Sequence, residues 1–429
     1  MSNISTVILA AGKSTRFKST KSKLLHDLAG LPIIAHVYNI AKKISGRKII
    51  IVCNKNNIQE LKSLFSDCIF VIQKKQNGTA NAILAAKPYL LNKNFLVLFG
   101  DVPLVSIKSI KKLINKFKNK KSSGSMIAFQ ASDPFGYGRI KIKSNKVLKV
   151  VEDFYTNNEE QKIKLCNSGV LLVKSNLFFK NLSQIKINNI KKEKFLPDIF
   201  EIYFHQNKPF SYILCSEEEM LGVNTLDDFI KIDAIYQHTL VNKLIKKGVL
   251  IINPESCRLS FDTKIEKGVT IETNVVIKEK VKIAKGTTIK SHSYIQGTII
   301  RENCSIGPYA RIRPSSIISK NAKIGNYVEI KNSIVGDSSS IAHLSYIGDT
   351  EIGKKVNIGA GTITCNFDGK NKHRTIIKDG VFIGSNSSLV APIMINKNAK
   401  IAAGSVINKD IPAKYLAIER SKLKFIKKN

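Results

Sequence analysis

Residues Ile265 to Ile295 read IEKGVT-IETNVV-IKEKVK-IAKGTT-IKSHSY-I, with an isoleucine at every sixth position. The same spacing of branched aliphatic residues continues, with interruptions, to Ile407. Neither an α-helix, with about 3.6 residues per turn, nor a simple alternating strand produces this period over so many turns. The stretch therefore predicts a solenoid in which each hexad forms one short face and turns its aliphatic residue inward.

A three-sided parallel β-helix accounts for the repeat, since three hexads complete one coil. Twenty-two hexad starts predict about seven coils. Glycine often follows the aliphatic residue, as at Gly325 and Gly384, and it suits a recurring corner because it tolerates positive φ. The pattern resembles the hexapeptide-repeat acyltransferases, which implies a left-handed helix, whereas the general rule for parallel crossovers favours a right-handed one. A passive spacer is the alternative, because the repeat itself carries no chemistry.

The composition limits the class of protein. A chain of 429 residues can form two or three domains. It has no apolar run of membrane length, and Val7–Ala11 is too short for a signal peptide. Its seven scattered cysteines, with no C-x-x-C pair, favour a reducing compartment and argue against a zinc site. We expect a cytoplasmic protein with no membrane partner.

The formal charge of +37 does not by itself indicate a nucleic-acid partner. Nucleic-acid-binding proteins gather basic residues into a patch or stripe with aromatic residues between them. Here lysine is spread along the whole chain with abundant isoleucine and asparagine, as compositional drift in an AT-rich genome would produce. We therefore expect no nucleic-acid binding, although such a surface attracts anionic substrates.

Residues 1–224 alternate short apolar runs with helical patterns, which predicts a Rossmann-like α/β domain with a mostly parallel sheet. Ligands of such sheets bind outside the carboxyl ends of the strands. The predicted strands are Thr6–Ala11, Lys48–Cys53, Cys68–Ile72 and Phe95–Leu98, and predicted helices include Ile33–Lys43 and Thr79–Leu90.

The segment after the first strand has the composition of a phosphate-binding loop. Small residues and Gly12 let backbone N–H groups approach a phosphate chain, and Arg16 and Lys23 can neutralise its charge. A P-loop is excluded, because Val7 stands where its first glycine is needed. Taken alone, the segment is also compatible with an ordinary βα turn carrying exposed lysines.

Several motifs together resemble one family. Leu9–Arg16 is similar to the L-x-x-G-x-G-T-R signature of sugar-phosphate nucleotidylyltransferases, with Ser14 at its second glycine. Further matches follow in order at Gln73, Gln76–Ala82, Phe99–Leu104, Gly136–Ile140, Glu152, Asn167–Gly169 and Gly222–Asn224. Over nearly its full length the chain resembles the bifunctional N-acetylglucosamine-1-phosphate uridylyltransferase/glucosamine-1-phosphate acetyltransferases, the GlmU family.

The resemblance implies a uridylyltransferase site that uses UTP and Mg²⁺. Attack of a sugar phosphate on the α-phosphorus of UTP needs positioning and charge neutralisation, which Arg16 and Lys23 would supply. Asp101 is a hard oxygen ligand suited to Mg²⁺, and by resemblance Asn224 is the second ligand. Without the resemblance, Asp101 is equally compatible with a structural role as a turn residue before Pro103. Residues implied to bind UTP or the product are Leu9, Ala10, Ala11, Gly12, Lys23, Gln73, Gly78, Thr79, Phe99, Gly100, Asp101, Gly138, Glu152, Asn167 and Asn224.

Some positions depart from the family pattern. Ser22 replaces a proline, Ala80 and Asn81 replace Gly-His, and Phe99 replaces a tyrosine. Because no charged or metal-binding group is lost at these positions or at Ser14, we expect uridylyl transfer to be weakened rather than abolished.

Within the repeat, residues with reactive or charged side chains are concentrated where the hexads are interrupted. His343 is a candidate base for an amine that attacks a thioester, because the imidazole pKa lies near working pH. A lone histidine on a repeat face is more often structural, but its neighbourhood resembles the acetyltransferase half of the family. The resemblance implies a sugar-phosphate site formed by Arg313, Lys331, Tyr346, Asn357 and Lys372.

The longest interruption, residues 362–376, predicts a loop expelled from the solenoid. By resemblance this loop covers the site of a neighbouring subunit in a homotrimer. Acetyl-coenzyme A would contact Ala360, Asn366, Phe367, Ser385, Ala403 and Arg420, and Phe367 stands where the family has tyrosine. The array also looks about one coil shorter than its relatives near Ile295–Ile306. The lysine-rich tail after Arg420 receives no role.

The sequence thus predicts a uridylyltransferase domain at residues 1–224, a linker helix at 225–248 and an acetyltransferase β-helix at 249–429. The linker prediction rests on a capping box at Thr225–Asp228 and a stop at Lys246–Gly248. The product would be UDP-N-acetylglucosamine, which feeds peptidoglycan and lipopolysaccharide precursors. Two alternatives remain open: a nucleotide-sugar pyrophosphorylase with a purely structural solenoid, and a non-catalytic regulatory subunit of the same architecture.

Overall fold

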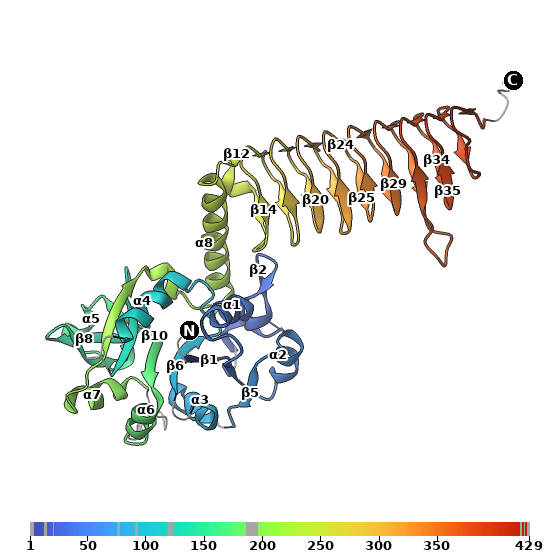
Figure 1. Ribbon diagram of the computed structural model, residues 1–429. Helices are drawn as coiled ribbons and strands as arrows, with labels where there is room; N and C mark the ends of the chain where they lie inside the picture. Colours follow the sequence, from blue (N-terminus) through green and yellow to red (C-terminus); the bar gives the residue numbers. More distant parts are fainter. Residues whose placement is uncertain are drawn as a thin grey trace. The chain divides into compact units, whose positions relative to one another are not determined.

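The computed structural model describes residues 4–12, 15–19, 21–74, 78–90, 93–118, 123–185, 196–420, 423 and 425–426. The chain divides into two compact units, residues 1–235 and 236–429, and Figure 1 shows the elements of each. The expectations for Ser14, for Gln76 and Asn77 and for the lysines of the tail lie outside the described residues. Among the described residues, no helix combines the length and hydropathy that crossing a bilayer requires.

The first unit is built on a mixed β-sheet. Its main strand order is β11-β7-β10-β6-β1-β4-β5, with the hairpin β8–β9 attached to β10. The strands are β1 Ile4–Leu9, β4 Ile49–Cys53, β5 Ile69–Ile72, β6 Asn94–Phe99, β7 Gly124–Gln130, β8 Arg139–Lys143, β9 Lys146–Val151, β10 Leu165–Lys174 and β11 Ser211–Cys215; β2 Asp27–Leu28 and β3 Leu31–Pro32 form a separate hairpin. The helices are α1 Ile33–Ser45, α2 Ile58–Leu64, α3 Thr79–Ala85, α4 Ile107–Phe117, α5 Asn158–Gln161, α6 Ser175–Leu182 and α7 Asp198–His205.

The prediction of a mostly parallel sheet holds for the centre of the sheet but not for the whole sheet. Strands β6, β1, β4 and β5 are parallel neighbours. Strand β10 runs antiparallel to both β6 and β7, so the sheet is mixed. The apolar runs in the sequence indicated that the strands are buried but not in which direction they run, because a buried strand has the same composition in either orientation.

The predicted helix Thr79–Leu90 ends early, at Ala85, and a separate 3-10 turn follows at Lys87–Tyr89. Pro88 explains the break, because proline has no N–H to continue the helical ladder and its ring clashes with the preceding turn. Helix α1 matches its prediction more closely and ends at Gly46, whose φ of 60° favours glycine.

Helix α8, Leu226–Ile245, carries the chain from the first unit into the second. At its start the Asp228 N–H donates to Thr225 Oγ1 at 3.1 Å, and the Thr225 N–H donates to Asp228 Oδ2 at 2.9 Å. This reciprocal pair is the capping box that the sequence predicted. At the other end Gly248, with φ of 91°, stops the helix as predicted.

The second unit is a parallel β-helix with three faces, each named here after its first strand (Figure 1). The β12 face contains β12 Leu250–Ile251, β15 Thr270–Ile271, β18 Thr288–Ile289, β21 Ser305–Ile306, β24 Lys323–Asn326, β27 Ser340–His343, β30 Asn357–Ile358, β33 Phe382–Ile383, β36 Lys400–Ile401 and β38 Leu416–Ala417. The β13 face contains β13 Arg258–Leu259, β16 Val276–Ile277, β19 Tyr294–Ile295, β22 Arg311–Ile312, β25 Glu329–Lys331, β28 Tyr346–Gly348, β31 Ile363–Cys365, β34 Ser388–Val390 and β37 Val406–Ile407. The β14 face contains β14 Lys264–Ile265, β17 Lys282–Ile283, β20 Thr298–Ile300, β23 Ser316–Ile318, β26 Ile334–Val335, β29 Thr350–Ile352, β32 Thr375–Ile377 and β35 Ile393–Ile395.

The shortest face has eight strands, so the described residues contain eight complete coils where the hexad count predicted about seven. The count began at Ile265 and so missed β12 and β13 of the first coil. It also missed strand β20, whose inward Ile300 comes only five residues after Ile295, and β31, whose inward residue is Thr364. The inward isoleucines are almost completely buried and form one continuous core along the solenoid. Burial of this apolar ladder is the main force that holds successive coils together.

The β14 face carries an apolar column on its outer surface. Ile299, Ile317, Ile334, Ile376 and Met394 occupy matching outward positions on successive strands, with Glu351 between Ile334 and Ile376. The β12 face is polar at several equivalent positions, including Thr288, Ser305 and Lys323. We call the apolar set the isoleucine column.

Candidate active sites

Lys23 is the centre of the polar network in the first unit. Its Nζ donates to Asp101 Oδ2 at 2.6 Å, to the Val223 carbonyl at 2.6 Å and to Asn224 Oδ1 at 3.3 Å. Arg16 Nη2 donates to the same Asn224 oxygen at 3.2 Å. The structure thus brings together the four residues that the sequence assigned to phosphate and metal chemistry.

The backbone around Lys23 also explains how one departure from the family pattern is accommodated. Lys23 begins a 3-10 turn, Lys23–Leu25, and Ser22 precedes this turn with φ of −54°. That angle lies in the range to which a proline ring restricts φ, about −65 ± 15°. Ser22 therefore adopts the backbone angle that a proline would fix, and the Lys23 side chain remains directed at Asp101.

A cavity of about 610 Å³ lies beside this network. Its lining includes five residues that the resemblance assigned to the uridylyltransferase site: Arg16, Phe99, Asp101, Asn167 and Asn224. Further lining residues that the sequence reasoning missed are Tyr137, Glu217, Asp228 and Lys231. Its size suits a small organic ligand, since such pockets occupy about 300–1,000 Å³.

Asp101 and Asn224 are suited to share a divalent cation. Their side-chain oxygens both lie within hydrogen-bonding distance of Lys23 Nζ, so they converge on one point where a positive group is already held. Mg²⁺ prefers oxygen ligands and needs few of them from the protein, because waters and substrate phosphates complete its shell. Among the described residues no cluster of three or more histidine, cysteine or acidic side chains offers a more enclosed metal site.

The loop after β1, which the sequence analysis assigned to phosphate binding, is held by two asparagines that the same analysis did not single out. Asn57 Nδ2 donates to the Ala10 carbonyl at 2.8 Å, and Asn54 Nδ2 donates to the carbonyls of Ala11 and Gly12 at 3.3 and 3.4 Å. Each asparagine also accepts the backbone N–H of the other. A side chain at Gly12 would meet no atom of the described residues within 4 Å, so these residues leave space there for a ligand.

Gln73 and Gly78, which the resemblance assigns to the nucleotide base, are in contact. Gln73 Nε2 donates to the Gly78 carbonyl at 3.2 Å, and Gly78 has φ of 87°, which favours glycine. Thr79 begins helix α3. Ala80, which replaces the glycine of the family pattern, is 1% exposed, so its added methyl group is accommodated by packing in the core.

The residues assigned to the sugar also lie close together. The Asn167 N–H donates to the Gly138 carbonyl at 2.8 Å, and a methyl group at Gly138 would lie 3.7 Å from Glu152 Oε2. Phe99 packs directly over Gly169, where an added Cβ would lie 2.4 Å from the ring. Gly100 follows Phe99, and its N–H donates to the Leu9 carbonyl at 2.9 Å, which ties the β6 end to the phosphate loop.

In the β-helix, His343 ends strand β27 and pairs with Asn326 on the preceding coil. His343 Nδ1 lies 2.5 Å from Asn326 Oδ1. An amide oxygen can only accept a hydrogen bond, so this contact places a proton on Nδ1 and leaves Nε2 free to accept one. Asn326, which the sequence analysis did not single out, therefore selects the tautomer that a general base needs.

His343 also belongs to a column that runs along one corner of the solenoid. The carbonyls of Asn326, His343, Ala360 and Ser385 each accept an N–H from the next coil, donated by Leu344, Gly361, Asn386 and Gly404. Ala403 follows at the equivalent position, and its carbonyl accepts from Arg420 Nε at 2.9 Å. We call this the corner column; it aligns His343 with four of the residues assigned to acetyl-coenzyme A.

A cationic cluster occupies the next corner, after the β13 face. It contains Arg313, Lys331 and Lys372, and the ammonium group of Lys372 lowers the pKa of Lys331. Burial tends to raise the pKa of Asp349 nearby, but hydrogen bonds from Asn332 and Asn366 and the two lysines lower it overall. Two lysines this close favour an anion between them.

Other predicted residues surround the same corner. A side chain at Gly348 would collide with the Tyr346 hydroxyl at 2.6 Å and with the Asn366 amide at 2.8 Å, so both groups lie over this glycine. Asn366 and the exposed Phe367 stand on the loop between β31 and β32. Asn357 is different, because it begins β30 on the β12 face, three residues before Ala360.

Within one chain, therefore, the predicted acetyltransferase residues form two groups. His343 lies at the corner after the β12 face, whereas Arg313, Lys331 and Lys372 lie at the corner after the β13 face. Among the described residues no hydrogen bond or ion pair joins His343 to these cations. The sequence resemblance assigned them to a common site without this division.

Comparisons with known proteins agree with both halves. Residues 6–163 match the MobA-like NTP transferase domain, residues 242–321 and 298–387 match the GMPPB C-terminal domain, and residues 374–409 match the bacterial transferase hexapeptide, six repeats. The proteins called bifunctional protein GlmU from Bartonella bacilliformis and Zymomonas mobilis are 39% and 41% identical to this chain, over 98% and 97% of it and 94% of their own lengths. That of Streptococcus agalactiae is 36% identical over 98% of this chain and 96% of its own length.

A nucleotidyltransferase unit followed by a left-handed hexapeptide β-helix defines a two-domain transferase. On the near full-length identity with these relatives, the chain belongs to the bifunctional GlmU family. It is an enzyme of UDP-N-acetylglucosamine synthesis with uridylyltransferase and acetyltransferase activities.

Proposed function

We propose that the two activities use the two networks described above, within domains at residues 1–224 and 249–429 joined by the linker 225–248. The β-helix acetylates glucosamine 1-phosphate from acetyl-coenzyme A, with His343 as the base. The first unit then joins the resulting N-acetylglucosamine 1-phosphate to UTP and releases pyrophosphate. The observation that carries this proposal is the convergence of Arg16, Asp101 and Asn224 with Lys23, matched by the His343–Asn326 pair in the solenoid.

In uridylyl transfer, the sugar phosphate oxygen forms a bond to the α-phosphorus of UTP as the bond to pyrophosphate breaks. Mg²⁺, held by Asp101 and Asn224, would neutralise charge on the phosphates. Arg16 and Lys23 bring positive charge to the same place, and Asn54 and Asn57 keep the loop carbonyls turned away from the incoming anion. Positioning and charge are the main contributions a protein can make to phosphoryl transfer.

In acetyl transfer, the sugar amine attacks the thioester carbonyl, a C–N bond forms and the C–S bond breaks. His343 Nε2 accepts the proton that the amine loses, and the coenzyme leaves as a thiolate that is then protonated. Ala360, Ser385, Ala403 and Arg420 lie along the corner column where the coenzyme would extend. Arg313, Lys331 and Lys372 offer charge-assisted hydrogen bonds to the sugar phosphate.

We further propose a homotrimer assembled through the β-helix. Two observations support it: His343 and the cationic cluster lie at different corners of one chain, and the isoleucine column gives the β14 face an apolar outer surface. A neighbouring copy would bring its cationic corner and its loop, with Asn366 and Phe367, to the His343 corner. The free cysteines among the described residues also suit the cytoplasm that we propose as its location.

A paired assay on the purified full chain tests the assignment. Thiol release is measured with acetyl-coenzyme A and glucosamine 1-phosphate, and pyrophosphate release with UTP, N-acetylglucosamine 1-phosphate and Mg²⁺. His343→Ala should abolish only the first signal and Asp101→Ala only the second, while His292→Ala, a control elsewhere on the solenoid, should retain both. Thiol release that persists in His343→Ala would refute its role as the base, and pyrophosphate release alone from the unmodified chain would reduce the solenoid to a scaffold.

A further inference from the structure

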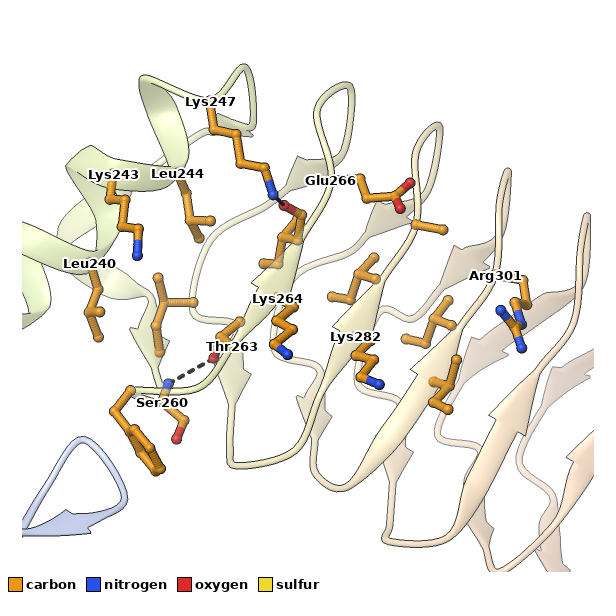
Figure 2. A pocket seen from close by; sticks show the side chains of 17 residues that line it. Leu240, Lys243, Leu244, Lys247, Ser260, Thr263, Lys264, Glu266, Lys282 and Arg301 are labelled. Atoms are coloured by element: carbon orange, nitrogen blue, oxygen red, sulfur yellow. Dashed lines mark hydrogen bonds between the residues drawn. The ribbon is translucent and has the colours of Figure 1, made fainter. Parts of the chain in front are cut away.

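A second large cavity lies in the β-helix unit, at a distance along the chain from the residues assigned to catalysis. Its volume is about 550 Å³, and it is formed between the last turns of α8 and the first three strands of the β14 face (Figure 2). No residue that lines it belongs to the corner column or to the cationic cluster. Its size lies within the range of small-molecule sites, about 300–1,000 Å³.

The cavity has an apolar floor. Leu240 and Leu244 approach from α8, and Phe261 and Ile299 line the solenoid side. Ile299 is also the first member of the isoleucine column, so the cavity lies where the outer surface of the β14 face changes from lysine to isoleucine. Such a floor favours a ligand with an apolar part.

The rim of the cavity is cationic. Lys264 and Lys282 are direct partners on neighbouring strands, and Figure 2 shows their side chains extended side by side. Lys243 comes from α8 and Arg301 from the turn after β20, so positive charge surrounds the opening. Lys247 is already engaged, because its Nζ donates to the Ile265 carbonyl at 2.7 Å.

These cations lack the acidic partners that some other cations of the solenoid have. Arg313 pairs with Glu329 at 2.9 Å and Arg374 with Glu351 at 3.3 Å, in each case across adjacent coils. Among the described residues Lys243, Lys264, Lys282 and Arg301 form no ion pair, and the one acid that lines the cavity, Glu266, accepts the Lys285 N–H. Like charges on directly opposed strand positions, about 4.8 Å apart, repel each other, and a bound anion removes that repulsion.

We propose that this cavity binds an organic phosphate ester, with the phosphate between Lys264, Lys282 and Arg301 and the organic group against Leu240, Leu244 and Phe261. A dianionic phosphate matches several cations that line one cavity better than a single carboxylate does. An apolar group on the ester distinguishes the ligand from inorganic phosphate, which could satisfy only the rim. The cavity shares no lining residue with either proposed catalytic site, so a phosphate ester bound there would occupy a different site from the substrates.

Titration calorimetry on the full chain, at constant ionic strength, tests this site with three probes: hexyl phosphate, hexanol and inorganic phosphate. Hexyl phosphate should bind at least tenfold more tightly than either of the others. Lys264→Glu combined with Lys282→Glu should weaken its binding at least tenfold, and the neutral pair Lys264→Gln and Lys282→Gln should weaken it less. Lys267→Glu is the matched control, because Lys267 is exposed in the same coil but does not line the cavity.

Retention of both enzymatic rates in these variants would show that they fold, since none of the substituted residues is assigned to catalysis. Hexyl phosphate binding that survives both double substitutions would belong to a catalytic site or to the general basic surface, and would overturn the proposal. Equal binding of hexyl phosphate and inorganic phosphate would also overturn it, because the apolar floor would then contribute nothing.

Discussion

His343 Nδ1 lies 2.5 Å from Asn326 Oδ1, its direct partner on the preceding coil. The parallel register of two adjacent strands, and not any local sequence signal, places this amide oxygen behind the imidazole. The contact fixes which ring nitrogen carries the proton, and it leaves the other nitrogen available as a base.

Asn326→Leu should therefore reduce the kcat of acetyl transfer by roughly 10²-fold, within the range that general base catalysis contributes. Binding of acetyl-coenzyme A should change little, because the new side chain would not alter the backbone hydrogen bonds of the corner column. Asn326→Asp should instead shift the acidic limb of the pH–rate profile upward, since a carboxylate beside the ring stabilises imidazolium. Unchanged uridylyl transfer serves as the control, and an unchanged pH profile in Asn326→Asp would contradict the tautomer role.

Asn57→Ala should affect both stability and nucleotide binding. It leaves the buried Ala10 carbonyl without its donor, which costs about 1–3 kcal/mol, and it frees the phosphate loop. We expect a lower urea midpoint and a raised KM for UTP, with acetyl transfer unaffected. Asn56→Ala is the control, because Asn56 is exposed and its side chain forms no hydrogen bond in the described structure; an equal effect there would argue against a specific role for Asn57.

Gly169→Ala should disturb the sugar side of the uridylyltransferase cavity. The added Cβ would lie 2.4 Å from the Phe99 ring, and φ of 75° already disfavours a side chain there. Uridylyl transfer should fall at least tenfold through displacement of the ring. In a double-mutant cycle with Phe99→Ala, the steric part of the loss should disappear and only the backbone part remain. Strict additivity would show that the ring and the glycine are not coupled.

The loop between β31 and β32 should open in acid. Asp368 accepts N–H groups from Asn371 and Lys370 and a bond from His373 at 2.6 Å, and these contacts hold its pKa well below the usual range. A depressed carboxyl pKa stabilises the folded loop fully above the unfolded value of about 3.9, and this contribution is lost as pH falls through the folded value. Hydrogen exchange of the Lys370 and Asn371 amides should be protected equally at pH 7 and pH 5 after correction for intrinsic rates.

Asp368→Asn should remove that protection at neutral pH and raise the KM for acetyl-coenzyme A, because Asn366 and Phe367 stand on the same loop. Protection that is already lost between pH 7 and pH 5, where the Asp368 carboxylate keeps its charge, would contradict the role assigned to Asp368.

The isoleucine column allows a direct test of assembly. Ile317→Asp should place a charge in the interface proposed for the trimer, and sedimentation velocity should then report smaller species. Acetyl transfer should fall with the loss of trimer while uridylyl transfer remains. Thr288→Asp, at an outward position of the β12 face, is the matched control. A trimer that persists in Ile317→Asp would exclude the β14 face as the interface.

The sequence predicted the architecture well where one physical signal repeats many times. The hexad period located most of the solenoid, and the capping box at Thr225 located the start of α8. The period failed at Ile300, because a five-residue step there breaks the register, and at Thr364, because the inward residue is polar. Strand direction was missed at β10 because burial does not encode it.

Candidate site residues with a charge could also be singled out from the sequence, as Lys23 and Asp101 illustrate, and the structure brings these two side chains into contact. The supporting amides were not. Asn54 and Asn57 hold carbonyls of the loop after β1, and Asn326 contacts a residue of the next coil, so their partners are distant in sequence. Asparagine is also common throughout this chain, so no local pattern distinguishes these three residues. The position of Asn54 directly after the buried strand β4 was the one available hint.

The corner column has a further consequence. Each coil advances the backbone by about 4.8 Å, so the three steps from His343 to Ala403 span about 14 Å along one edge. For the proposed coenzyme site, the number of coils therefore fixes a distance. The acyl-carrying molecule must be long enough to contact Arg420 while it presents its acyl group at His343. Removing one coil between these residues would shorten the distance between them by about 4.8 Å. The length of the site alone would then select among acyl donors, independently of contacts with particular side chains.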